Sequence, residues 1–118
     1  MKRVKDKLYS INLNQYRNWH PMVENKVKKQ YSDDLEDQLS GLTFNGPITL
    51  DYQVFKPTRA RLDKMNVIAI TSKYFQDALV NWECIPDDND DFIKDEFVRP
   101  TIYDKNNGRV EITIKTIN

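Results

Sequence analysis

Carboxylates are concentrated in one short stretch of the chain. Asp87, Asp88, Asp90 and Asp91 place four of them within five residues, interrupted only by Asn89. Carboxylates this close repel one another, and a hard divalent cation relieves the repulsion by taking their oxygens as ligands. The alternative is a solvated acidic loop, which is the commoner fate of such a run. Because the chain has one cysteine and one histidine, a Cys/His zinc cluster is excluded, and any metal must be held by oxygen.

A second group of reactive side chains precedes this loop. Asn66, Lys73 and Asp77 are spaced by seven and four residues, which places them within about 40° of one another on a helix. Asp63 stands at the expected start of that helix. Carboxylates beside an ammonium group suit metal binding and the stabilisation of charge on a phosphate. The structural alternatives are that Asp63 is an ordinary N-cap and that Lys73 and Asp77 form an exposed pair, worth about 0.2–0.5 kcal/mol.

The helix that must carry these side chains is predicted from Asp63 to about Trp82. Its apolar residues cover roughly half of the circumference; they are Val67, Ile68, Ile70, Tyr74, Phe75, Ala78, Leu79 and Trp82. A helix that is apolar over so wide an arc packs into a core and leaves a narrow polar strip. The arc would suit a subunit contact as well as a core.

The ordered set of motifs resembles the RusA-type Holliday junction resolvases. The similarity rests on RLDKMN at 61–66, KYFQDAL at 73–79 and IPDD at 85–88. The core of that family has an acidic motif ending in Asn, a helix with Lys and Asp-Ala-Leu, and then paired Asp residues. One acid of the family motif is replaced by Met65, and four more residues than usual separate Asn66 from the Asp-Ala-Leu motif.

The resemblance assigns roles residue by residue. It implies that Asp63, Lys73 and Asp88 are catalytic, and that the metal ligands are Asp63, Asp77, Asp87 and Asp88, where Asp77 and Asp87 are the nearest candidates for the acid missing at Met65. It also implies that Asn66 and two residues of a loop near the active site, Asn14 and Arg17, contact DNA.

The activity implied by the resemblance is structure-selective cleavage of DNA. We expect a Mg²⁺-dependent endodeoxyribonuclease, in which Mn²⁺ can substitute, that hydrolyses four-way junctions or other branched DNA during recombination and repair. Because such junctions have two-fold symmetry, the resemblance implies a homodimer. Enzymes of this type are commonly encoded by phages and prophages. The alternatives are a protein of the same fold that binds branched DNA but cuts it weakly or not at all, and a small scaffold protein with neither activity.

Charge is segregated along the chain although the net charge is zero. Residues 1–30 carry eight Lys and Arg against two acids, whereas residues 76–98 carry one against eight. A basic face beside an acidic pocket suits a nuclease, because phosphates need cations and the metal needs carboxylates. Folding that mixes these blocks into a neutral surface is the alternative. A predicted strand brings Arg59 and Arg61 to the mouth of the central helix, where we expect DNA contacts.

The remaining elements follow from hydrophobic periodicity. Alternation predicts strands over 7–13, 48–54, 92–103 and 110–114, and a four-residue stripe predicts a helix over 21–39. Pro100 implies an edge or a bulge, and residues 104–108 predict a hairpin turn. The order β-α-β-α-β-β predicts an α/β (α+β) fold, with a small mixed sheet and two main helices, in a single domain over 1–118. No apolar run reaches the ~20 residues of a membrane span, so we expect no membrane partner and a cytoplasmic location.

Overall fold

The computed structural model describes residues 2–6 and 19–117. Its elements, in chain order, are β1 (Lys2–Asp6), α2 (Pro21–Asp34), α3 (Glu36–Leu39), β2 (Ile48–Lys56), α4 (Lys64–Asn81), β3 (Ile93–Val98), β4 (Ile102–Tyr103) and β5 (Arg109–Thr116). The strands form one mixed sheet in the order β1-β5-β2-β3, and β4 pairs with β2 beyond the end of β3. The prediction of a small mixed sheet packed with helices is confirmed, but the order differs from the predicted β-α-β-α-β-β. Among the described residues the sheet has five strands instead of four, and a third, four-residue helix, α3, follows α2.

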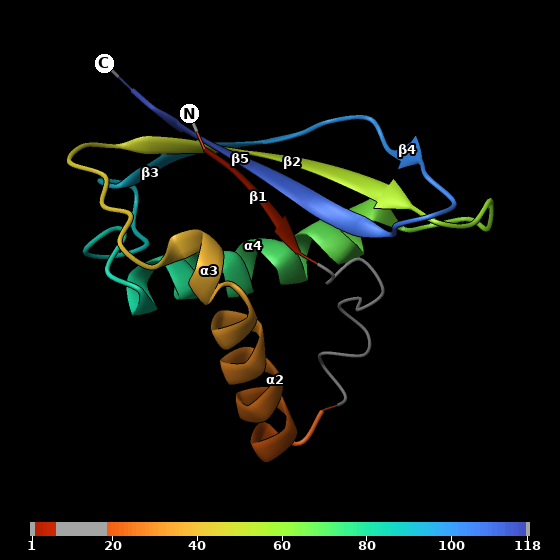
Figure 1. The fold of residues 1–118 in the computed structure, drawn as a ribbon, viewed down its shortest axis with the longest axis horizontal. Helices are drawn as coiled ribbons and strands as arrows, with labels where there is room; N and C mark the ends of the chain where they lie inside the picture. The colour runs from red at the N-terminus through yellow and green to blue at the C-terminus, as the bar shows by residue number, and fades with distance from the viewer. Residues whose placement is uncertain (1, 7–18, 118) are drawn as a thin grey trace.

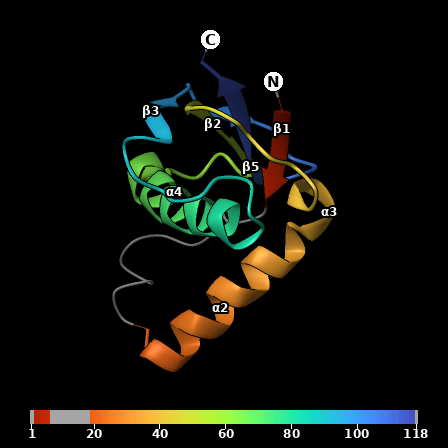
Figure 2. The same ribbon diagram turned by 90° about the vertical axis from the view of Figure 1, so that its left-hand side faces the viewer.

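The helices lie on one side of the sheet, and α4 runs along it (Figures 1 and 2). Strand β2 is central: it is antiparallel to β5 and parallel to β3. Alternate residues of β2 and β5 are fully buried in the core, namely Leu50, Tyr52, Val54, Val110, Ile112 and Ile114. The residues between them lie on the opposite side, which we call the outer face.

The central helix agrees with its prediction. Asp63 is its N-cap and Trp82 its C-cap, and the seven apolar residues predicted between them are all buried. The apolar arc is therefore occupied by the core of its own chain, and the expectation that it also serves a subunit contact is wrong. Neither α4 nor another helix in the part of the chain that the structure describes is long and apolar enough to cross a membrane.

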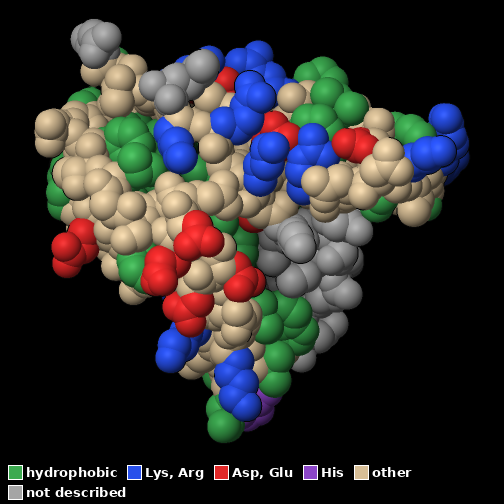
Figure 3. All heavy atoms as spheres, viewed as in Figure 1, with side chains coloured by type: hydrophobic (Ala, Val, Ile, Leu, Met, Phe, Trp, Pro, Cys, Tyr) green, Lys and Arg blue, Asp and Glu red, His purple; other side chains and the backbone are tan. Residues whose placement is uncertain are grey.

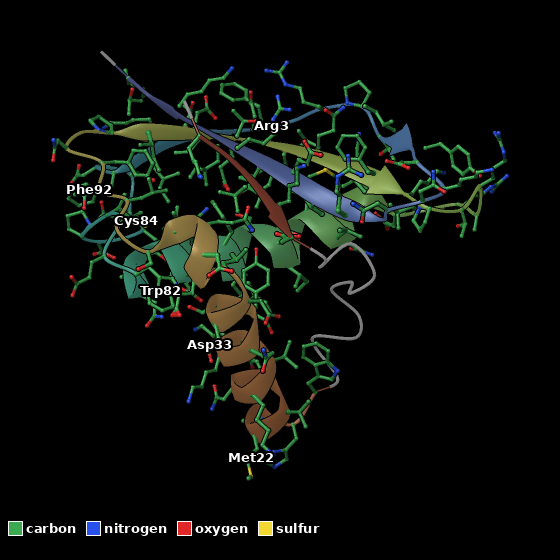
Figure 4. All side chains as sticks on the ribbon, viewed as in Figure 1. Arg3, Met22, Asp33, Trp82, Cys84 and Phe92 are labelled. Atoms are coloured by element: carbon green, nitrogen blue, oxygen red, sulfur yellow. The ribbon has the colours of Figure 1, made fainter. Side chains whose placement is uncertain are left out.

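The helix predicted over 21–39 bends at Leu35 and divides into α2 and α3. The stripe is buried only in its second half, where the exposed fractions of Leu35 and Leu39 are 2% and 0%. In the first half, Met22 and Val23 are exposed, and α2 projects away from the sheet with Met22 at its tip (Figure 4). The short α3 places Leu39 in the core.

The first strand that the structure describes was not predicted from the sequence. The strand expected over 7–13 lies outside the described residues, and the described strand is β1, whose Val4 pairs with Ile112. Only Val4 is a buried apolar residue in β1, so the strand shows no alternation in the sequence. Two side-chain contacts fasten it. The Tyr31 hydroxyl donates to Asp6 Oδ2 (2.6 Å), and the Gln38 amide makes two bonds with Lys5, accepting from its backbone N–H (2.9 Å) and donating to its carbonyl (2.8 Å).

The strand predicted over 92–103 is interrupted. Residues 99–101 separate β3 from β4, because Pro100 has no N–H to donate to a ladder. The prediction that this segment lies at a sheet edge is confirmed for β3. The hairpin predicted at 104–108 is wrong, since β4 and β5 both pair with β2, from opposite sides, and not with each other among the described strands.

Candidate active site

A groove between α2 and α4 contains most of the predicted acidic residues. Its volume is about 660 Å³, and the loop that follows α4 contributes to its wall. It brings Asp77, Asp87 and Asp88 together with Lys28 and Lys29 of α2. The groove therefore combines carboxylates, which suit a hard cation, with ammonium groups, which suit a phosphate.

Asp77 makes a salt bridge with a lysine that sequence reasoning did not assign to the site. Lys28 Nζ lies 2.8 Å from Asp77 Oδ2, and the two side chains are 41% and 30% exposed. Lys28 precedes the buried Ser32 by one helical turn, so it emerges on the side of α2 that meets α4. The four-residue spacing of Lys28 and Ser32 can be read from the sequence. Only the tertiary structure shows that the partner of Lys28 is Asp77.

The acidic loop is ordered by its own side chains. Asp87 Oδ1 accepts from the backbone N–H of Asp88 (2.8 Å), and Asp87 Oδ2 accepts from Asn89 Nδ2 (3.2 Å). Asn89 Oδ1 accepts from the backbone N–H of Asp91 (2.9 Å), and the Asn89 carbonyl accepts from Phe92. These bonds fix the turn between α4 and β3 and keep Asp87 and Asp88 at the groove.

Asp63 lies at the other end of α4. Its Oδ1 accepts from the Asn66 backbone N–H (3.3 Å) and its Oδ2 from Asn66 Nδ2 (3.0 Å), so it caps the helix. At 1.5 Å per residue, about 21 Å of helix axis separates Asp63 from Asp77, whereas metal–oxygen bonds span about 2.0–2.6 Å. The prediction that Asp63 shares one ion with Asp77, Asp87 and Asp88 within a single chain is therefore wrong. The cause is that Asp63 caps the first turn of α4, whereas Asp77 lies in its last turns and Asp87 and Asp88 follow its end.

The other predicted residues occupy different positions. Asn66, Lys73 and Asp77 lie outside the core on the polar strip of α4, as predicted, with Lys73 exposed. Arg59 and Arg61 are exposed at the Asp63 end of the helix, and the Arg59 guanidinium lies 4.4 Å from the centre of the Tyr103 ring. Asn14 and Arg17 lie outside the described residues. Contact of Asn66, Arg59, Arg61, Asn14 and Arg17 with DNA stays a prediction.

A second polar cluster, which the sequence did not indicate, joins the other flank of α4 to β3. Glu96 Oε1 accepts from the Tyr52 hydroxyl (2.5 Å), Ser72 Oγ (2.6 Å) and Gln76 Nε2 (2.8 Å). Burial of Tyr52, and then the charge of Glu96, raise the pKa of Tyr52 well above its ordinary value. The cluster keeps Tyr52 a neutral donor and attaches the edge strand to the helix.

The carboxylate oxygens of the groove are the type of ligand that Mg²⁺ prefers. Within residues 2–6 and 19–117, no group of three or more His, Cys, Asp or Glu side chains is placed to hold a metal. Mg²⁺ commonly uses one or two carboxylates and completes its shell with water and substrate phosphate oxygens. Asp77 and Asp88 could supply two such carboxylates from the groove.

Comparison with known proteins does not assign the chain to a family. No model of a known protein family matches the chain, and no curated protein matches it. The resemblance to RusA-type resolvases therefore rests on the motifs within 61–88, and a function has to be argued from the site.

Proposed function

We propose that this chain is a metal-dependent endodeoxyribonuclease that cuts four-way junctions or related branched DNA, as the resembling RusA-type resolvases do. The groove supports this proposal, because Lys28 and Lys29 lie with Asp77, Asp87 and Asp88 around one hollow. Phosphodiester hydrolysis needs cations that hold the phosphate backbone and carboxylates that hold Mg²⁺ or Mn²⁺.

Each group in the groove has a role in this reaction. Asp77 and Asp88 would hold the metal ion, which when bound supplies a water of lowered pKa and neutralises the leaving oxygen. Lys28 exchanges its partner Asp77 for a phosphate oxygen of the substrate, and Lys29 holds the adjoining phosphate. Lys73, one turn before Asp77, presents a compact positive charge to the phosphate undergoing attack.

A homodimer gives Asp63 a place in this site. In two copies with antiparallel α4 helices, Asp63 of one copy would lie near the C-terminal end of the partner's α4, which the loop with the partner subunit's Asp88 follows. The exposed strip of α4 includes Met65, whose exposed fraction is 58%, and Ala69, which are available for such a contact. Two sites related by a two-fold axis match the symmetry of a four-way junction.

The test is cleavage of a labelled synthetic four-way junction in Mg²⁺. Wild type should nick the junction, whereas Asp88→Asn should bind it without nicking. Asp90→Asn is the matched control, because Asp90 lies in the same loop and does not line the groove. Absence of nicking by wild type in both Mg²⁺ and Mn²⁺ would refute the enzyme.

Mixed dimers test the shared site. One copy carries Asp63→Asn and the other carries Asp88→Asn. If each site takes Asp63 from one copy and Asp88 from the other, one of the two sites remains intact, and the mixture nicks although each variant alone does not. If both residues serve the same site from one chain, no site is intact and the mixture is inactive.

One observation favours a second candidate, a module that binds branched DNA without cutting it. Asp63, Asp77 and Asp87 already have protein partners, namely Asn66, Lys28 and the acidic loop itself. Carboxylates engaged in this way can serve structure alone. This candidate predicts junction binding that weakens steeply with salt and is not accompanied by nicking.

A further inference from the structure

The outer face of the sheet carries an ordered set of charged and aromatic side chains. Register places Arg3, Thr113, Asp51 and Phe97 in one row across β1, β5, β2 and β3. Arg3 extends on the side away from the helices (Figure 4). Lys and Arg side chains gather along this side in Figure 3, with some Asp and Glu side chains among them, and a further group of Asp and Glu side chains lies over α3 and the adjacent end of α2.

Asp51 lies beneath two cations of this face. Its Oδ2 accepts from Arg99 Nη2 (2.9 Å) and is 3.3 Å from Lys115 Nζ. Asp51 is 8% exposed, but the side chains of Arg99 and Lys115 are 54% and 47% exposed. The positive charges therefore face solvent, and the negative charge lies below them.

Glu111 repeats this arrangement in the neighbouring row. Its carboxylate accepts from Arg109 Nε (2.6 Å) and lies 3.7 Å from Arg3 Nε. Glu111 is 8% exposed, whereas the Arg3 side chain is 63% exposed. Asp95, on β3, is an exposed acid that bounds the basic surface on that side. The exposed charge between β1 and β2 is thus positive and complements a polyanion.

A hollow of about 350 Å³ lies among these residues, and Arg3, Arg99 and Lys115 contribute to its lining. Asp51 also lines it, and Asp51 Oδ1 is buried without a hydrogen-bond partner among the residues that the structure describes. An acceptor left without a donor is destabilising, and an incoming N–H group would relieve it. Because the side chains of Arg99 and Lys115 are about half exposed, they can turn toward a ligand and uncover this oxygen.

An exposed aromatic ring lies beside the hollow. Phe97, in the same row as Asp51, is 44% exposed. An arginine already contacts a ring on this face: the Arg109 guanidinium lies 3.8 Å from the centre of the Phe55 ring. Exposed rings beside cations can stack bases while the cations hold the phosphates, which is how single strands are bound on open sheets.

We infer that the outer face binds single-stranded nucleic acid. Arg3, Arg99 and Lys115 hold successive phosphates, a base stacks on Phe97, and an N–H of a base donates to Asp51 Oδ1. This surface lies on the opposite side of the sheet from the groove between α2 and α4. The inference therefore does not depend on the proposed nuclease activity.

The test is fluorescence anisotropy of a labelled oligothymidylate, measured with the full chain at several salt concentrations. Phe97→Ala should weaken binding about fivefold or more, since stacking contributes about 1–3 kcal/mol per base, whereas Phe97→Tyr should retain it. Arg3→Ala should lower the slope of log affinity against log salt by about 0.7. It leaves Glu111 paired with Arg109, so the fold is retained. The matched controls are Met22→Ala and Lys26→Ala, exposed residues of α2 that should change neither quantity.

Other outcomes overturn the inference in distinguishable ways. If Lys29→Ala in the groove abolishes oligonucleotide binding and Phe97→Ala does not affect it, the groove is the binding site, and the nuclease proposal stands without this one. If phosphatidylglycerol vesicles are bound and the oligonucleotide is not, the basic surface serves a membrane. If oligonucleotide binding depends on Phe97 but the chain does not cut junctions, this inference is supported and only the proposal of nuclease activity is refuted.

Discussion

Asp63 has two candidate roles, and two substitutions separate them. As the N-cap of α4 it accepts two hydrogen bonds from Asn66, and in the proposed nuclease it is a metal ligand. Asparagine caps a helix about as well as aspartate, because its side-chain oxygen accepts the same backbone bond, whereas alanine has no acceptor. Asparagine is neutral, however, and its amide oxygen does not supply the negative charge that a carboxylate brings to Mg²⁺.

The size of the capping effect follows from the structure. Loss of the cap in Asp63→Ala removes about 1 kcal/mol of stability. The unfolding entropy of about 2.1 cal/mol/K per residue, applied to 118 residues, converts this loss into a fall in Tm of about 4 °C. Asp63→Asn should leave Tm within about 1 °C of wild type.

The assay combines thermal unfolding, followed by far-UV circular dichroism, with junction cleavage. Asp63→Ala should lose both stability and cleavage, and Asp63→Asn should lose cleavage alone. Asp90→Asn removes the same charge from an exposed position and should lose neither. An Asn variant as unstable as the Ala variant would refute the capping argument, and an Asn variant that cleaves like wild type would leave Asp63 with the structural role only.

Three further predictions concern the fold. Tyr31→Phe removes the donor to the buried Asp6 and should lower the free energy of unfolding by about 2 kcal/mol; an unchanged urea midpoint would contradict this. Burial raises the pKa of Asp51. The hydrogen bonds from Arg99 and Lys115 together lower this pKa by more than burial raises it, so it lies below its ordinary value. The charged form therefore stabilises the fold above about pH 4. That contribution is lost as pH falls through the folded pKa, and an Asp51→Asn variant whose stability declines as steeply in acid as wild type would refute the assignment. Gln38→Ala should cost about 1 kcal/mol and accelerate hydrogen exchange at the Lys5 amide but not in β2, and equal acceleration in both strands would indicate global unfolding instead.

Local signals in the sequence were sufficient for some elements and absent for others. Helix α4 was predictable because a capping aspartate precedes a wide apolar arc, and both act within the segment itself. Strand β1 was not, because four of its five residues are charged and its place depends on pairing with β5 and on the bond from Tyr31 to Asp6. The interruption at Pro100 was foreseeable from its missing N–H, but the pairing of β4 with β2 depends on the whole sheet.

The candidate site was predictable in its residue types but not in its geometry. The spacing of Lys73 and Asp77 gave their common strip correctly. The fourteen residues from Asp63 to Asp77 make almost four full turns and so preserve the direction of the side chains, but they span about 21 Å of helix axis and hold the two carboxylates apart. Lys28 was missed because its partner Asp77 is far away in the chain, and no local pattern encodes such a contact.

The side-chain amide of Gln38 occupies the edge of the sheet at β1. It accepts one hydrogen bond from the Lys5 N–H and donates one to the Lys5 carbonyl, as the backbone of a further strand would. A strand from another molecule that approaches β1 must first displace it. At β3, the opposite edge, the described side-chain bond to the backbone comes from the strand itself, since the Glu96 N–H donates to Asp95 Oδ1 (2.9 Å). Continuous edge-to-edge association of copies requires both edge strands of the sheet to pair with strands of other molecules. A chain with this substitute on one side can recruit a single neighbour through β3, after which growth stops.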